Sequence, residues 1–252
     1  DWSSDVCSSD LFNLSTMKKL IVLFILIAQI AIGQGVNRQN VGLSIGASMP
    51  LSDFRKDILN DSTSGFAKTG VALSFNYMYR LTHNFGLQLI INYSSNAIDN
   101  IKYRNALEAQ HPDYGVSVES SRNWSSGGLY LGPYLRLPIG EKLSWDIRAL
   151  FGAMGAYSPS ITIRTTNKEN PNDKGEYYMV SSRATNFSYS IGTGFKYRIR
   201  SNYYLLLFGD YVKSSMDFKD SSGWDWDSEP YIKPFSREIN YITITGGISY
   251  IF

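Results

Sequence analysis

The amino-acid sequence predicts an all-β protein, an eight-stranded antiparallel transmembrane β-barrel. Two observations lead to this prediction: eight segments alternate apolar with small or polar side chains, and the connections between them alternate between short and long. Side chains on a strand point to opposite faces with period two, so each segment has one apolar and one polar face. Such strands suit a closed barrel, which leaves no unpaired backbone group in hydrocarbon.

The chain divides into three ranges, of which the first two precede the predicted strands. Residues 1–16 lack the character of a targeting segment, and we interpret them as upstream read-through or a cloning scar. Residues 17–33 have a basic start, an apolar run and small residues at the end, which predicts a secretory signal peptide cleaved before Gln34. A transmembrane anchor is the alternative, but the apolar run over residues 20–27 is shorter than the roughly 20 residues that a spanning helix needs. The barrel domain is expected over residues 34–252.

Composition excludes several other classes of function. The chain has 24 Lys and Arg against 22 Asp and Glu, a net charge of +2 that is too small to argue for a nucleic-acid partner. Its one cysteine, Cys7, lies in the first range, so neither a disulfide framework nor a lipid-attachment cysteine is expected. The sequence contains no phosphate-binding glycine loop, dinucleotide fingerprint or His/Cys cluster, so no cofactor and no metal are expected.

The alternation has the same parity in the first seven segments. In each of them the odd-numbered residues form the apolar face, as in residues 187–199, where Phe187 and Ile191 oppose Ser188. In the last segment, residues 240–252, the even-numbered residues are the apolar ones. The first seven segments lie within residues 41–49, 71–80, 85–94, 129–137, 143–152, 187–199 and 203–211.

Charged residues in these segments fall on the polar face. A charge on the lipid face near the bilayer midplane costs about 2 to 4 kcal/mol, so the parity of the charges decides which face points into the lumen. Buried charges must be paired, and the sequence places both acids and bases there. We therefore predict a lumenal network of ion pairs and hydrogen bonds formed by Arg80, Arg136, Asp146, Arg148, Lys196, Arg198 and Asp210.

Two other uses of the lumen stay open. An eight-stranded barrel is just wide enough for side chains to fill it, but the excess of bases over acids also fits a narrow anion-selective pore. A site for a small apolar molecule is supported by the inward positions of Met78, Ile90, Leu206 and Phe208.

Short and long connections alternate along the chain. Residues 81–84, 139–142 and 200–202 are predicted hairpin turns. Four long connections lie between the other segments, which matches the periplasmic turns and extracellular loops of outer-membrane barrels. These four loops are residues 51–68, 97–123, 158–183 and 215–237.

With these features the chain resembles the small eight-stranded outer-membrane barrels of the OmpA transmembrane-domain, OmpX and OmpW type, and more specifically the PorT-like barrel proteins of the Bacteroidota. The resemblance implies the outer membrane of a Gram-negative envelope, contact with outer-membrane lipid and lipopolysaccharide, and an accessory role in protein secretion. It also implies that the outer-membrane assembly machinery reads Phe252 as a signal. Besides the eight segments, the residues that carry it are Lys18, Lys19, Gln34, Tyr250, Ile251 and Phe252.

The last long loop carries the candidate contact residues. Trp224 and Trp226 are expected to bind a protein partner or to rest on lipid head groups, because aromatic residues recur in both places. Asp225, Asp227 and Glu229 could supply oxygen ligands to calcium. Their spacing does not match the helix-loop calcium motif, so we expect a solvated acidic loop instead.

An enzyme would need a constellation of catalytic groups, and the sequence offers little. His111 lies in the second long loop with Ser117 and Ser120 nearby, whereas His83 lies in a predicted turn. A general base without an identified nucleophile is a weak signal. We therefore predict a protein that is not an enzyme, with an outer-membrane enzyme that has a rim site near His111 as the least favoured alternative.

The sequence thus predicts an integral outer-membrane barrel with a surface-interaction, envelope-structural or secretion-accessory role. A narrow channel or a binder of small solutes is the main alternative. A soluble lipocalin-like barrel is a further one, but it would turn its apolar face inward, and the aromatic-rich outer face argues against it. One fold hosts unrelated functions, so the choice depends on the sites.

Overall fold

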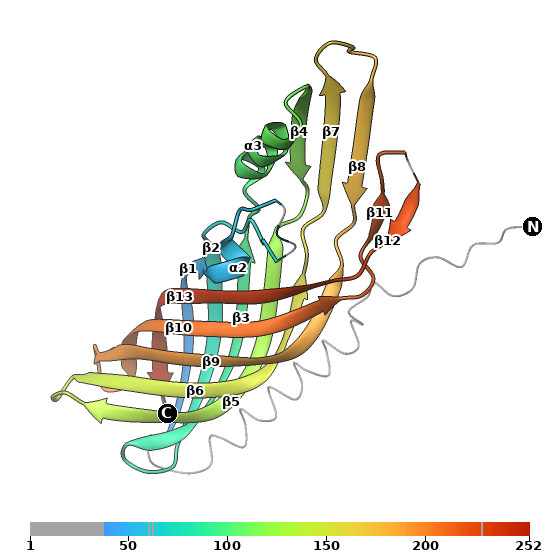
Figure 1. The fold of residues 1–252 in the computed structure, drawn as a ribbon. Coiled ribbons are helices and arrows are strands. Elements are labelled where there is room, and N and C mark those ends of the chain that lie inside the picture. The colour runs from blue at the N-terminus through green and yellow to red at the C-terminus, as the bar shows by residue number, and fades with distance from the viewer. Residues whose placement is uncertain (1–37, 60, 62, 228) are drawn as a thin grey trace, which may run out of the picture.

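A computed structural model describes residues 38–59, 61, 63–227 and 229–252. The two ranges predicted as read-through and signal peptide, residues 1–16 and 17–33, lie outside the described residues. Within the described part of the chain, no helix is long and apolar enough to cross a membrane. Figure 1 shows a barrel of strongly tilted strands with a smaller sheet rising from one end.

The barrel closes with eight strands in the order β1-β13-β10-β9-β6-β5-β3-β2. Every neighbouring pair is antiparallel, which confirms the predicted fold class. Strands on the long-loop side continue past the predicted segments, so the barrel is taller than the sequence pattern indicated. The strands are β1 (Gln39–Pro50), β2 (Gly70–Arg80), β3 (Phe85–Asn96), β5 (Trp124–Pro138), β6 (Leu143–Tyr157), β9 (Arg183–Arg198), β10 (Tyr203–Phe218) and β13 (Phe235–Ile251).

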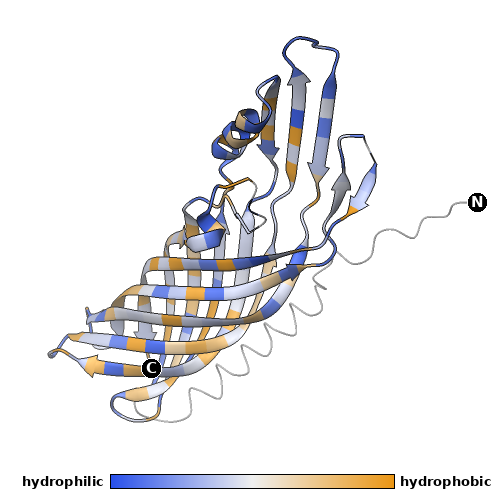
Figure 2. Cartoon of the chain, viewed as in Figure 1, coloured by the Kyte–Doolittle hydropathy of each residue, from blue (hydrophilic) through white to orange (hydrophobic). Residues whose placement is uncertain are grey.

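The apolar face of the barrel strands points outward. Leu43 on β1 is 67% exposed and Ile191 on β9 is 55% exposed, while their neighbours Ser44 and Ser190 are buried inside. In the last strand the parity is reversed, as predicted, because Ile244 is exposed. Hydrophobic residues accordingly recur along the barrel strands in Figure 2. This arrangement suits a lipid-facing barrel and not a lipocalin-like one.

Three of the four long loops contribute strands to a second sheet. Strands from the last three loops pair in the order β12-β11-β8-β7-β4, and we call this five-stranded unit the loop sheet. Figure 1 shows it standing above the end of the barrel opposite the short turns. Its strands are β4 (Tyr114–Ser120), β7 (Ile161–Asn167), β8 (Lys174–Met179), β11 (Ser222–Trp224) and β12 (Pro230–Ile232).

One helix covers one face of the loop sheet. Helix α3 (Asn100–Gln110) begins after Asp99, whose side chain accepts a hydrogen bond from the Lys102 backbone N–H at 3.2 Å. Such a cap satisfies one of the helix's unpaired amide groups. Tyr103 and Leu107 of α3 pack against a buried cluster contributed by three of the loops. That cluster is Phe66, Ile98, Val116, Val118, Ile161 and Ile163.

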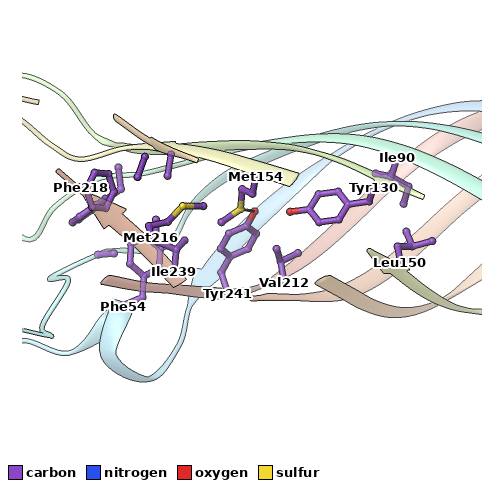
Figure 3. Packing of buried hydrophobic residues seen from close by; sticks show 14 residues of the cluster. Phe54, Ile90, Tyr130, Leu150, Met154, Val212, Met216, Phe218, Ile239 and Tyr241 are labelled. Atoms are coloured by element: carbon purple, nitrogen blue, oxygen red, sulfur yellow. Dashed lines mark hydrogen bonds between the residues drawn. The ribbon is translucent and has the colours of Figure 1, made fainter. Parts of the chain in front are cut away.

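The first loop closes the mouth of the barrel. It contains helix α2 (Ser52–Arg55), whose Phe54 is 2% exposed and makes an edge contact with Trp124 at 5.6 Å between ring centroids. The indole Nε1 of Trp124 donates a hydrogen bond to the Gly65 carbonyl oxygen at 2.9 Å, which ties the loop down. Figure 3 shows Phe54 at one end of a column of buried side chains that continues through Met216 and Tyr241 to Leu150.

Ile191→Arg tests the outward parity of β9. A charge at this lipid-facing position costs about 2 to 4 kcal/mol near the midplane, so we expect the folded, heat-modifiable band to disappear from gels of outer-membrane fractions. Ile191→Phe keeps an apolar group there and should migrate like the wild type. Normal folding of the arginine variant would contradict the assigned parity.

Candidate functional site

Asp146 lies between two cations inside the barrel. Its Oδ2 atom is 2.7 Å from Lys196 Nζ, and its Oδ1 atom is 3.2 Å from Arg136 Nε. Arg136 is the register partner of Asp146 across β5 and β6, whereas Lys196 comes from β9. The Lys196 side chain is fully buried, and Nζ lies 5.7 Å from the centre of the Tyr134 ring. One carboxylate therefore neutralises charges from two other strands and links three strands of the wall.

A second ion pair spans the width of one strand. Arg148 on β6 donates two hydrogen bonds to Asp210 on β10, at 2.7 and 2.5 Å. Strand β9 runs between them, and Gly192 is the register partner of both residues. A Cβ atom at Gly192 would lie 1.8 Å from Asp210 Oδ1. The missing side chain thus makes room for a bidentate pair between non-neighbouring strands.

These two groups contain five of the seven residues predicted for the lumenal network. The other two are near the turn end of the barrel, where Arg80 and Arg198 are half-buried. Nη2 of Arg198 donates to the Glu141 backbone carbonyl oxygen at 2.6 Å, so it holds a turn instead of joining Asp146 or Asp210.

Apolar side chains fill the space around the ion pairs. Met78, Leu206 and Phe208, three of the residues considered for a lumenal ligand site, pack on one another and on Tyr134. Ile90, the fourth, belongs to the separate column shown in Figure 3. Between this column and the Arg148–Asp210 pair lies a cavity of about 20 Å³, close to the size of one water molecule. This packing argues against both a pore and a lumenal ligand site.

The loop sheet places the two candidate tryptophans on opposite faces. Trp224 is 49% exposed and stacks on Tyr178, with 5.6 Å between ring centroids. Trp226 is 46% exposed and lies at 5.6 Å from Tyr177, on the α3 side. Neighbouring residues on a strand face opposite ways, so the Tyr177–Tyr178 pair on β8 sets this division. The two tryptophans therefore do not form one contact patch.

Trp226 forms one wall of a cleft of about 520 Å³ between the end of α3 and the β7–β8 hairpin. His111 and Asp227 also line this cleft, together with Asp173, whose Oδ2 accepts a hydrogen bond from the Tyr114 hydroxyl at 3.1 Å. The lining residues are Leu107, His111, Tyr114, Val116, Thr165, Asp173, Lys174, Gly175, Trp226 and Asp227.

Among the residues that the structure describes, none of those lining the cleft is a serine, which an enzyme with a base at His111 would need as nucleophile. Val116 lines the cleft, so Ser117, the next residue on β4, points to the other face of the sheet, where Arg164 is its register partner. Ser120, at the end of the same strand, is not a lining residue either. The structure thus does not bring the predicted rim-site residues together.

The acidic residues of the last loop have a structural role. Asp225 Oδ1 accepts hydrogen bonds from the backbone N–H groups of Asp227 and Glu229, at 3.1 and 2.9 Å, and so shapes the turn between β11 and β12. On β12, burial raises the pKa of Tyr231, and a hydrogen bond with the Tyr177 hydroxyl raises it further. Tyr231 therefore stays protonated at physiological pH and holds this hairpin against β8.

Phe252 lies at the seam where the barrel closes. Its backbone N–H donates to the Gln39 carbonyl oxygen at 3.0 Å, next to the pairing of β13 with β1. Its ring stacks on Tyr250 with 6.1 Å between centroids. The predicted assembly signal is thus also part of the contact between the first and last barrel strands.

Comparison with protein-family models matches residues 20–252 to the outer membrane protein beta-barrel domain. The chain belongs to this family. As a member of the outer membrane protein beta-barrel family with a closed eight-stranded barrel, it is a protein of the Gram-negative outer membrane. The comparison with curated protein sequences gives no significant match.

Several solved outer-membrane structures are similar in architecture. Ail of Yersinia pestis is 13% identical, with 85% of this chain and 99% of that chain covered and a TM-score of 0.40. A major outer membrane protein from Thermus thermophilus is 11% identical, with coverages of 85% and 99% and a TM-score of 0.45. OprG from Pseudomonas aeruginosa is 10% identical, with coverages of 86% and 98% and a TM-score of 0.37.

Asp146→Leu tests the role of the lumenal carboxylate. The change leaves Arg136 and Lys196 buried without their partner, so we expect a loss of about 3 to 5 kcal/mol in the free energy of unfolding, measured by urea titration in lipid vesicles. Adding Lys196→Met removes one of the unpaired charges and should recover part of the loss. Glu141→Gln, at an exposed turn, serves as the control and should unfold like the wild type. A double variant no more stable than Asp146→Leu would contradict the pairing.

Proposed function

We propose that this outer-membrane barrel is a non-enzymatic surface-interaction protein that binds a protein partner through its loop sheet. The surface that supports this proposal is the face opposite α3, at the β11–β12 hairpin. Tyr178, Trp224, Pro230 and Ile232 share that face because Trp224 is the register partner of both Tyr178 and Pro230, and Ile232 lies two residues beyond Pro230. We call these four residues the hairpin face.

The main support for this proposal is the solvent exposure of the hairpin face. Ile232 is 76% exposed and Trp224 is 49% exposed, although both belong to a folded sheet with its own buried cluster. A contiguous apolar patch held open to water by an ordered scaffold is typical of a protein contact site. Trp and Tyr are also the residues that most often dominate binding energy at such sites.

The partner is expected to contact side chains and not to add a strand. Strand β12 is an edge of the loop sheet, but it is three residues long and begins with Pro230, which has no N–H group to donate. Short edge strands that contain proline are protected against strand addition. Recognition therefore depends on the exposed side chains of Trp224 and Ile232.

The filled lumen supports the interaction role over the channel. Buried ion pairs and apolar clusters occupy the barrel interior, and the mouth is covered by α2, so solute passage has no structural support. Within this proposal, a PorT-like secretion-accessory role is the finer hypothesis. It rests on the sequence pattern that includes Lys18, Lys19 and Phe252.

Photo-crosslinking on living cells tests the hairpin face. A benzoylphenylalanine at position 232 should give one discrete protein adduct, and Trp224→Ser should reduce its yield sharply because loss of a hot-spot aromatic costs about 2 kcal/mol or more. The same label at position 104, on the exposed side of α3, is the control and should give no adduct. Equal adducts from both positions, or a yield that ignores Trp224→Ser, would refute the proposal.

The channel alternative has its own test. Purified protein in planar bilayers should show no discrete conductance steps, because the lumen is packed around the Arg148–Asp210 pair. Steps that change size in Asp210→Asn would assign transport to the lumen instead.

A further inference from the structure

A groove of about 590 Å³ runs along the lipid-facing surface near the loop end of the barrel. Its floor is backbone, because Gly127 of β5 and Gly155 of β6 are register partners and both point outward. Tyr93 of β3 pairs with Gly127 and forms one wall. Tyr157, two residues beyond Gly155 and on the same face, forms the other.

Packing within the protein does not require glycine at the floor. A Cβ atom at Gly155 would approach nothing closer than Thr185 Oγ1 at 3.6 Å, an ordinary contact. The neighbouring Gly152 differs, since its Cβ would lie 1.8 Å from the Leu129 carbonyl oxygen. None of the described glycines has a positive φ, so backbone conformation does not explain Gly155 either. What the missing side chain does provide is an open groove.

The groove is basic at its upper rim and apolar below. Arg122 and Arg183 line the rim with Asn123, and the Arg183 guanidinium lies 5.7 Å from the centre of the Tyr157 ring. Among the described residues, no acidic side chain forms an ion pair with either arginine. Toward the membrane centre, the next outward row is Ile91, Leu129, Ala153 and Phe187.

We propose that this groove binds one molecule of the phosphorylated glycolipid of the outer leaflet, lipid A. Its phosphate groups would contact Arg122 and Arg183, and one acyl chain would lie over Gly127 and Gly155. Guanidinium groups are well suited to phosphate because their donors form a planar fork. The apolar row below the glycines continues the path of the acyl chain into the bilayer.

The position of the groove favours this lipid over a phospholipid. It lies at the long-loop end, which in outer-membrane barrels is the extracellular side. On that side of a Gram-negative outer membrane the lipid is lipopolysaccharide, whose membrane anchor is lipid A. Tyr93 and Tyr157 flank the groove, and amphipathic aromatic rings of this kind are enriched where membrane proteins meet lipid head groups. Two bases that lack an acidic partner within the described part of the chain complement a lipid that carries two phosphates. This site is separate from the hairpin face, so either proposal can fail alone.

Lipid binding by the full chain in detergent, measured by native mass spectrometry with bisphosphorylated lipid A, tests the proposal. Arg122→Gln combined with Arg183→Gln should weaken binding by about tenfold or more, since each charge-assisted contact is removed. Arg200→Gln, an exposed arginine at the turn end, is the matched control and should bind like the wild type. Dephosphorylated lipid A should bind wild type and double variant equally.

A second variant fills the groove without touching the charges. Gly155→Phe should weaken lipid A binding, whereas Gly209→Phe, at an outward glycine elsewhere on the barrel with a nearest Cβ neighbour at 3.9 Å, should not. Heat-modifiable migration of each variant confirms that it is folded. Unchanged lipid A affinity in the double arginine variant would overturn the site. Wild-type binding of phosphatidylglycerol as tight as that of lipid A would overturn the choice of glycolipid.

Discussion

The structure depends on one constraint: in the bilayer core, every backbone N–H and C=O group needs a partner from the protein itself. Pairing of β1 with β13 meets this constraint by closing the sheet. Eight strands then leave an interior only wide enough for side chains. Closure therefore fixes two further properties of the molecule: its lumen must be packed, and any contact with another molecule must lie on the outer wall or on the loops.

The lumen is densely packed because inward-facing glycines lie next to large or charged side chains and leave room for them. Gly192 gives space to the Arg148–Asp210 pair, and Gly194, whose Cβ would lie 2.2 Å from Phe208 Cδ1, gives space to that ring. The ion pairs cross from strand to strand, so they also specify the register. Glycine has a different role at position 155, which faces outward. There the absent side chain leaves a groove open on the outer surface of the barrel.

Parity along the sequence was enough to predict the barrel, its outward face and the inward side of the charges within the predicted segments, because a period of two is a local property. Which charges pair was not predictable in this way. Arg148 and Asp210 meet across a strand that belongs to neither, so their contact depends on register and barrel width. The lipid-facing groove is not predictable for the same reason, since Tyr93, Gly127 and Gly155 become neighbours only when three strands are aligned.

The loop sheet is not predictable from the sequence, because its strands are short and pair between separate loops. The alternation at Val116 and Val118, and again at Ile161 and Ile163, was present in the sequence, but each run covers too few residues to mark a strand by itself. The barrel brings the loop ends together, and this proximity lowers the entropic cost of their pairing. The barrel strands thus hold the ends of the three strand-forming loops close together, and these loops fold as one sheet.

Amide hydrogen exchange in lipid nanodiscs tests most directly whether the closed barrel imposes this order on its loops. Backbone amides of β7 and β8 should exchange slowly, with protection factors approaching those of β9 and β10. They are paired in one sheet over a buried cluster. Exchange of β7 and β8 at the rate of unstructured peptide, while the barrel strands stay protected, would contradict the account.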